Sequence, residues 1–326
     1  MKILRTILGI PCLAFVLSGI FSLSVRLDAT ESTLPKDGEI PGTVAVGKNP
    51  ARILFDGTNI WVTNINSDTI TKLRASDGAT LGTFKVSSGP IDMAFDGTHI
   101  WITNSTSGKI TKLQASDGTI VGTFDAGNFP FAIAFDGTDV WVTNQSGNMV
   151  MKFRTSDGTK LGTFDVGTSP RDIISEGTNI WVVNASSNDV TKLRATDGAA
   201  LGTFRVGFGP RGIAFDGENI WTANFNSANV TKLRASDGAI LGTYDVGDNP
   251  RGIIFDGKYI WVTNYSSDTV MKLRASDGTI LGTFTTGTGP VAITFDGNYI
   301  WVANYLSNTV MKMKGSDPHF ILKRNE

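Results

Sequence analysis

Three arginines recur at one position of the sequence, spaced forty residues apart. Arg171, Arg211 and Arg251 each follow a proline, in the stretches PRD, PRG and PRG. A guanidinium group binds carboxylate or phosphate through paired, charge-assisted hydrogen bonds. If the fold brings the three positions together, they predict a site for an anionic ligand.

Three aromatic residues recur with the same spacing, each directly after an asparagine. They are Phe225, Tyr265 and Tyr305. Exposed aromatic rings beside cations suit a small anion, a glycan or a peptide as ligand. Two structural alternatives remain open: the arginines pair with neighbouring acids such as Asp172 and Asp248, and the rings only cap gaps between repeats.

Groups suited to catalysis are scarce, with two histidines and one cysteine in 326 residues. His99 falls in a predicted turn, His319 in the C-terminal tail and Cys12 in an apolar N-terminal segment. Nucleophilic, acid–base and zinc sites need a constellation of such groups. The pattern predicts a protein that is not an enzyme, with no catalytic residue, metal or cofactor. Asp92 and Asp172 could hold a cation, although two carboxylates are a weak basis for that.

These residues belong to a repeat of 40 residues without insertions. Each copy has a tryptophan eleven positions after its proline and an asparagine three positions after that tryptophan. The prolines are Pro50, Pro90, Pro130, Pro170, Pro210, Pro250 and Pro290, and the tryptophans are Trp61, Trp101, Trp141, Trp181, Trp221, Trp261 and Trp301.

The fifth copy shows what one repeat builds. Short apolar runs at 210–215, 219–224, 230–235 and 241–246 are separated by Asp-Gly turns or polar loops. Such runs are typical of strands joined in hairpins. Four antiparallel strands in about forty residues make one propeller blade. The chain is therefore predicted to be all-β, a seven-bladed β-propeller, with the tryptophans filling the wedges between sheets.

The last copy lacks its fourth strand, because the pattern ends at Pro318. Residues 42–47, GTVAVG, align in register with GTFKVS at 82–87. We expect this N-terminal strand to complete the seventh blade and close the ring. The competing candidate is FILKR at 320–324.

The chain is divided accordingly. Residues 1–29 are expected to form a signal peptide or an N-terminal anchor, because Lys2 and Arg5 precede an uncharged run. A linker at 30–41 leads to the propeller at 42–317, and 318–326 form a tail. The protein is expected to be exported, as a secreted, periplasmic or cell-surface monomer. A net charge of −1 without a basic stripe argues against nucleic acid as a partner.

The two faces of the disc differ in variability. Turns joining the first to the second strand, and the third to the fourth, lie on one face, here called the turn face. They read almost uniformly FDG and SDG, as tight hairpins require. The remaining loops lie on the opposite, variable face and differ between copies. Since loops on a rigid scaffold often carry recognition, the ligand site is expected there.

The repeat IWVTN…S.TVMKLRASDG..LGTF.VG..P.GI.FDG resembles the YVTN-type β-propeller repeats over residues 42–317. It is similar, more loosely, to streptogramin (virginiamycin B) lyase and NHL propellers. The first resemblance implies an exported or cell-surface protein. The second implies a magnesium-assisted elimination by histidine and glutamate near the channel, yet Glu176 and Glu218 fall in turns. The expected function is an exported binding or scaffold propeller. The alternatives are a streptogramin-lyase-like lyase or hydrolase acting at the central channel, and a structural repeat protein of the cell envelope.

Overall fold

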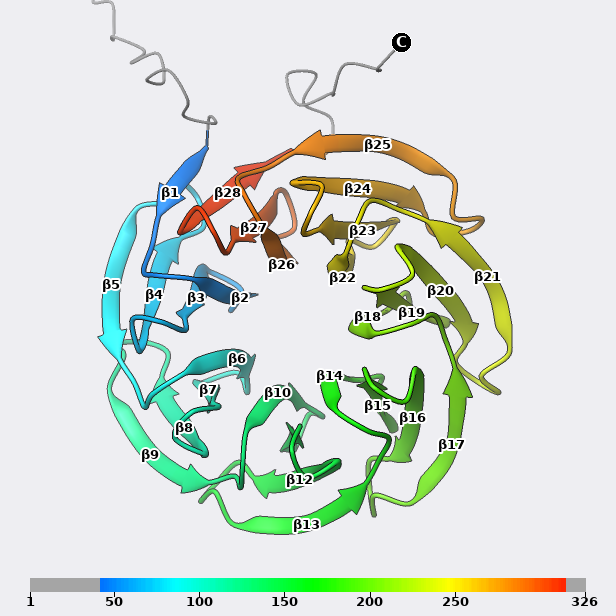
Figure 1. Ribbon diagram of the computed structural model, residues 1–326. Coiled ribbons are helices and arrows are strands. Elements are labelled where there is room, and N and C mark those ends of the chain that lie inside the picture. The colour runs from blue at the N-terminus through cyan, green and yellow to red at the C-terminus, as the bar shows by residue number, and fades with distance from the viewer. Residues whose placement is uncertain (1–41, 315–326) are drawn as a thin grey trace, which may run out of the picture. The chain divides into compact units, whose positions relative to one another are not determined.

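The computed structural model describes residues 42–314. The predicted signal segment, the linker and the tail at 318–326 lie outside the described residues. Within the described range the chain forms strands and no helix, and hence no helix that could cross a membrane. The strands make seven four-stranded antiparallel sheets arranged around a central axis (Figure 1). The predicted seven-bladed β-propeller is confirmed.

Each blade runs from an inner strand at the channel to an outer strand at the rim (Figure 1). The inner strands are β2 (Pro50–Phe55), β6 (Pro90–Phe95), β10 (Pro130–Phe135), β14 (Pro170–Ser175), β18 (Pro210–Phe215), β22 (Pro250–Phe255) and β26 (Pro290–Phe295). The second strands are β3 (Asn59–Asn64), β7 (His99–Asn104), β11 (Asp139–Asn144), β15 (Asn179–Asn184), β19 (Asn219–Asn224), β23 (Tyr259–Asn264) and β27 (Ile300–Asn304). The third strands are β4 (Thr69–Arg74), β8 (Lys109–Gln114), β12 (Met149–Arg154), β16 (Asp189–Arg194), β20 (Asn229–Arg234), β24 (Thr269–Arg274) and β28 (Thr309–Met313). The outer strands are β5 (Thr80–Lys85), β9 (Ile120–Asp125), β13 (Lys160–Asp165), β17 (Ala200–Arg205), β21 (Ile240–Asp245), β25 (Ile280–Thr285) and β1 (Thr43–Ala45).

The ring is closed by the N-terminal strand, as predicted. Strand β1 pairs antiparallel with β28, so that Thr43 lies opposite Met311. A side-chain bond reinforces the junction, since Lys312 Nζ donates to the carbonyl of Ala75 in blade one at 2.6 Å. The alternative closing segment at 320–324 lies outside the described residues.

The core lies between blades rather than within them. Trp221 and Val230 of blade five, for example, pack against Ile253 and Ile260 of blade six. Every tryptophan is almost fully buried. In six blades the tryptophan also packs against an aromatic ring of the outer strand, with centroids 5.3 to 5.9 Å apart. Each blade therefore needs its neighbour to cover its apolar face.

The loops occupy the faces expected from the sequence. Ile65 N, in the loop after β3, donates to Asn49 O in the loop that precedes β2. On the other side Ala115 N, after β8, donates to Thr98 O in the turn before β7. The variable face and the turn face are thus distinct surfaces of the disc.

The turn face fixes the tryptophans through one repeated hydrogen bond. In six blades the indole Nε1 donates to the turn aspartate, as Trp221 does to Asp216 at 2.8 Å. Blade four has Glu176 at that position, and Trp181 Nε1 is buried without a partner. An unsatisfied buried donor costs stability.

We predict that Glu176→Asp restores this hydrogen bond and raises the free energy of unfolding by about 1 kcal/mol. Denaturant unfolding followed by tryptophan fluorescence measures the change. Glu218→Asp, an exposed turn residue that does not face an indole, is the control and should shift the value by less than about 0.5 kcal/mol. Equal effects of the two substitutions would contradict the explanation.

Truncation tests the ring closure. A chain beginning at Ala51 lacks β1 and leaves the edge of β28 unpaired. It also loses the packing of Val44 and Val46 on the core between blades seven and one. We expect a loss of about 2–4 kcal/mol in the free energy of unfolding, or oligomerisation through the open edge. A chain beginning at Gly38 keeps β1 and is the control. If the shorter chain stayed monomeric and unfolded at the same temperature as the control, the prediction would be wrong.

Candidate ligand-binding site

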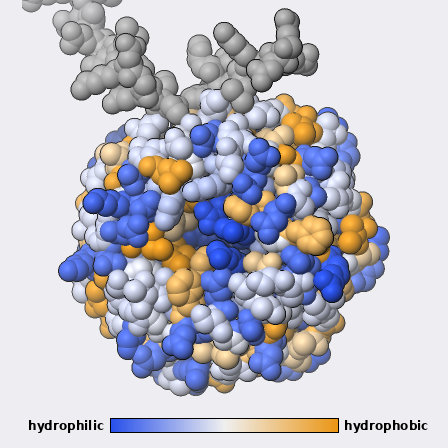
Figure 2. All heavy atoms as spheres, in the orientation of Figure 1, coloured by the Kyte–Doolittle hydropathy of each residue, from blue (hydrophilic) through white to orange (hydrophobic). Residues whose placement is uncertain are grey.

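A cavity of about 380 Å³ opens at the centre of the variable face. Inner strands line it together with residues directly after second strands, such as Tyr265 and Tyr305. Figure 2 shows hydrophilic side chains gathered around the central hollow of the face in view. The lining residues include four arginines and no carboxylate.

The three predicted arginines meet in this cavity. Arg171, Arg211 and Arg251 come from β14, β18 and β22, which are neighbouring inner strands (Figure 1). The predicted aromatic residues support them. The guanidinium of Arg211 lies 3.6 Å from the ring centroid of Phe225, and that of Arg251 lies 5.1 Å from the centroid of Tyr265.

Five of the six predicted ligand-binding residues therefore line one cavity, and Phe225 contacts Arg211 without lining it. The ion pairs do not support the alternative in which the arginines pair with neighbouring acids such as Asp172 and Asp248. Asp172 forms its ion pair with a different residue, Arg52, and no ion pair of Asp248 exists within the described residues. No salt bridge joins any of the three arginines to a carboxylate of residues 42–314.

Burial, and to a lesser extent the crowding of like charges, raises the energy of this arrangement. Burial, together with Arg251 and Arg171, lowers the pKa of Arg211 to about 9. Burial lowers the pKa of Arg251 to about 10, with a further contribution from Arg171. Burial alone lowers the pKa of Arg171. The guanidinium groups stay protonated at neutral pH, so the folded protein holds three positive charges that an anion would stabilise.

Sequence analysis did not predict one neutral partner of Arg171, the amide of Gln145. In the amide orientation that satisfies both atoms, its oxygen accepts from Ser169 Oγ at 2.8 Å and from Arg171 Nε and a terminal nitrogen at 3.1 Å. Arg171 also lies over the ring of Phe131 at 4.8 Å. These contacts orient Arg171 and leave its charge uncompensated.

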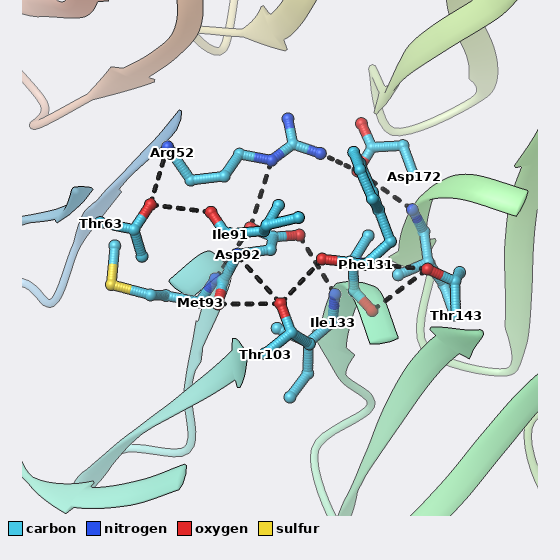
Figure 3. Close-up of polar contacts among 12 residues, drawn as sticks. Arg52, Thr63, Ile91, Asp92, Met93, Thr103, Phe131, Ile133, Thr143 and Asp172 are labelled. Atoms are coloured by element: carbon cyan, nitrogen blue, oxygen red, sulfur yellow. Dashed lines mark hydrogen bonds and ion pairs between the residues drawn. The ribbon is translucent and has the colours of Figure 1, made fainter. Parts of the chain in front are cut away.

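An ion network that sequence reasoning missed crosses the channel beside the arginines (Figure 3). Arg52 of β2 contacts Asp92 of β6 at 3.2 Å and Asp172 of β14 at 2.6 Å. The sequence signal was present, because the three residues occupy the same repeat position, two after the proline. The cation held between these acids is the guanidinium of Arg52.

The two carboxylates also bind the backbone of neighbouring blades. Asp92 Oδ2 accepts from Ile133 N, and Asp172 Oδ2 accepts from Ile213 N, both at 3.1 Å (Figure 3 shows the first). Among residues 42–314 no group of three or more His, Cys, Asp or Glu side chains is arranged so that it could hold a metal ion. The acids therefore act as ties between inner strands rather than as an open cation site.

A β-bulge in β14 explains how the side chains of the adjacent residues Arg171 and Asp172 can both lie at the channel. Side chains of a regular strand alternate between faces, which would separate Arg171 from Asp172. The pairing of β14 with β15 shifts register between Pro170 and Asp172. Such a shift re-aims side chains. Bulges of this kind recur at the start of the inner strands, for instance between Pro50 and Arg52.

The described histidine lies away from the cavity. His99 lies on the turn face as predicted, but it is the first residue of β7 rather than part of the turn, and its Nδ1 lies 3.2 Å from Asp96 Oδ2. His319 lies outside the described residues. The cavity instead offers guanidinium, phenol and amide groups, which are suited to binding.

The fold and the cavity define a seven-bladed β-propeller protein with a cationic pocket at the mouth of its channel. Within that class, the chain belongs to the family whose model is described as outer membrane protein assembly factor BamB, which matches residues 55–283. No curated protein matches significantly.

Solved structures support the fold. Hydrazine synthase of Kuenenia stuttgartiensis superposes with a TM-score of 0.74 at 20% identity, covering 86% of this chain and 99% of that one. Streptogramin B lyase gives 0.71 at 21% identity, covering 83% and 96%. Virginiamycin B lyase from Staphylococcus aureus gives 0.73 at 20% identity, covering 83% and 98%. The predicted likeness to streptogramin lyase propellers is confirmed for the fold, and the YVTN-type label stays a prediction.

The ion network predicts a pH-dependent stability difference. Burial raises the pKa of Asp172 to about 6, although Arg52 opposes the rise. A raised acid pKa means that the ionised group opposes folding above about pH 6, and this opposition disappears as the pH falls toward the ordinary value. The free energy of unfolding of Asp172→Asn, relative to that of the wild type, should therefore be most favourable at pH 8.

At pH 4 the difference in free energy of unfolding between Asp172→Asn and the wild type should be less favourable to the variant, by up to about 3 kcal/mol. Denaturant unfolding at both pH values measures the difference. Asp248→Asn, an exposed acid on the same face, is the control and should show no such trend. A difference between Asp172→Asn and wild type that is independent of pH would contradict the role of the buried carboxylate.

Proposed function

We propose that the protein is an exported, non-enzymatic binding propeller whose cavity on the variable face recognises an anionic ligand. One observation carries the proposal: three half-buried arginines share the cavity, and none has a carboxylate partner among residues 42–314. Buried charges are normally paired, because desolvation penalises a charge that is left alone. An anion bound between the guanidinium groups would supply the missing partner.

The arrangement is suited to selective binding. The guanidinium groups belong to neighbouring inner strands. Two of them lie over aromatic rings, Arg211 over Phe225 and Arg251 over Tyr265. A held side chain loses little further entropy when it binds, so its hydrogen bonds contribute more to affinity. The lining residues supply donors without a histidine, cysteine or carboxylate that could transfer a proton, which favours binding over lyase chemistry.

The family supports the cellular setting. Its model is named after an outer membrane protein assembly factor. That name agrees with the predicted signal segment at 1–29 and supports an exported location, with a protein partner in the envelope. A partner can dock on the variable face around the cavity, where the loops differ between blades.

Replacing the central arginine tests the binding site. We expect Arg211→Ala to weaken binding of sulfate or succinate at least tenfold, because it removes a desolvated hydrogen-bonding cation. The free energy of unfolding without anion should stay equal or rise, since like-charge crowding is relieved. Calorimetric titration and thermal unfolding at constant ionic strength measure both.

Arg234→Ala is the matched control, because Arg234 is exposed and paired with Asp237. It should leave anion affinity unchanged. Wild-type protein that shows neither heat of binding nor anion-dependent thermal stabilisation would refute the proposed function.

A further inference from the structure

The cavity has a second wall whose chemistry is opposite to that of the arginines. The residue after the proline is arginine in blades four to six, but Ala51, Ile91, Phe131 or Val291 in blades one, two, three and seven. All seven of these residues line the cavity. Because the blades follow one another around the axis (Figure 1), the residues after the proline form one cationic arc of the mouth and one apolar arc. Arg52 of blade one also lines the cavity, but its guanidinium is paired with Asp92 and Asp172.

Resting on the proposed function, we propose that the ligand is an amphiphilic anion. Its charged head binds the arginines of β14, β18 and β22, and its apolar body lies against the wall formed by blades seven, one, two and three. A bare inorganic ion would leave this wall in water, and an uncharged apolar molecule would leave the guanidinium groups unpaired. The cavity volume of about 380 Å³ falls within the range of small-molecule sites.

Phe129 is the most informative residue of the apolar wall. It has a positive φ of 61°, the left-handed conformation that bulky side chains rarely adopt. Other blades also have positive φ at the equivalent position, and most carry residues that tolerate it better, such as Asn49, Gly89 and Asn249. Phe129 is nevertheless 41% exposed and lines the cavity. Neither core packing nor backbone geometry accounts for a phenylalanine here, whereas contact with an apolar ligand does.

The two walls meet at a pair of rings. Phe129 stacks on Phe131 with centroids 6.3 Å apart and an interplanar angle of 24°. Arg171 lies over Phe131 at 4.8 Å. A ligand whose head contacts Arg171 therefore has its adjoining body next to this aromatic pair. This junction is the geometry that an anionic group attached to an apolar group requires.

Titration of the full-length protein with four probes tests the proposal: acetate, octanoate, octan-1-ol and octylammonium. Acetate supplies the head alone, octanol the body alone, and octylammonium the wrong charge. We expect octanoate to bind at least tenfold more tightly than acetate, since its extra methylene groups leave water, and more tightly than either other eight-carbon probe. Equal affinity for acetate and octanoate would contradict the proposal of an amphiphilic ligand but would still be consistent with the proposed anion site. Absence of binding by acetate, octanoate, sulfate and succinate alike would refute both.

Phe129→Gly gives an independent test. Glycine adopts positive φ without strain, so the variant should melt at a temperature about 2 °C higher than the wild type. Its affinity for octanoate should fall at least fivefold, with acetate affinity unchanged. Phe208→Ser is the control, because Phe208 is an exposed ring in a loop of the same face that does not line the cavity. If Phe129→Gly kept the full preference for octanoate over acetate, the apolar wall would have no role in binding.

Discussion

The structure depends on the packing of each blade against the next. A four-stranded sheet has two faces to cover, and here the indole of one blade fills the gap to its neighbour while its Nε1 bonds a turn aspartate. Lysines add a second link, since Lys232 Nζ lies over Trp221 and donates to Ala275 O of the following blade. Because the same contacts repeat around the circle, each blade can vary its exposed loops without weakening the core.

The uniform contacts explain which parts of the fold the sequence could predict. Tryptophans, Asp-Gly turns and the Gly-Thr of the outer strand are each set by one local requirement, so their spacing determined the blade number and the closing strand β1. Strand β1 departs from the repeat at one position, because Val44 stands where the outer strand of blade one has Phe84. The stacking ring is lost there, but the pairing with β28 is kept.

The candidate site was only partly predictable. The recurring arginines and aromatic residues pointed to one region, because equivalent positions of a closed ring converge at its centre. The contacts of Arg52 with Asp92 and Asp172 were not foreseen, since they join blades one, two and four across the channel. The bulges that turn adjacent side chains toward the channel also leave no mark in the periodicity. Phe129 stood out only after its φ was known.

Stability and the candidate site make opposite demands on the same residues. Three crowded guanidinium groups, an aromatic residue in a left-handed conformation and two buried carboxylates sharing one arginine all oppose folding when considered alone. They lie on the inner strands or directly before one, near the channel, whereas the repeated apolar contacts lie between blades. The repetitive frame thus supplies the stability that allows the central residues to remain strained and incompletely paired.

The junction between β1 and β28 has a consequence for how the molecule is made. The strand synthesised first among the described residues, β1, finds its partner only when the seventh blade appears, more than 260 positions later, as in the pairing of Thr43 with Met311. Until then the face of blade one that packs on blade seven in the closed ring stays exposed to solvent. The last step of folding therefore joins β1 to the seventh blade. Before that step, the main risk is that incompletely folded molecules associate through their exposed surfaces.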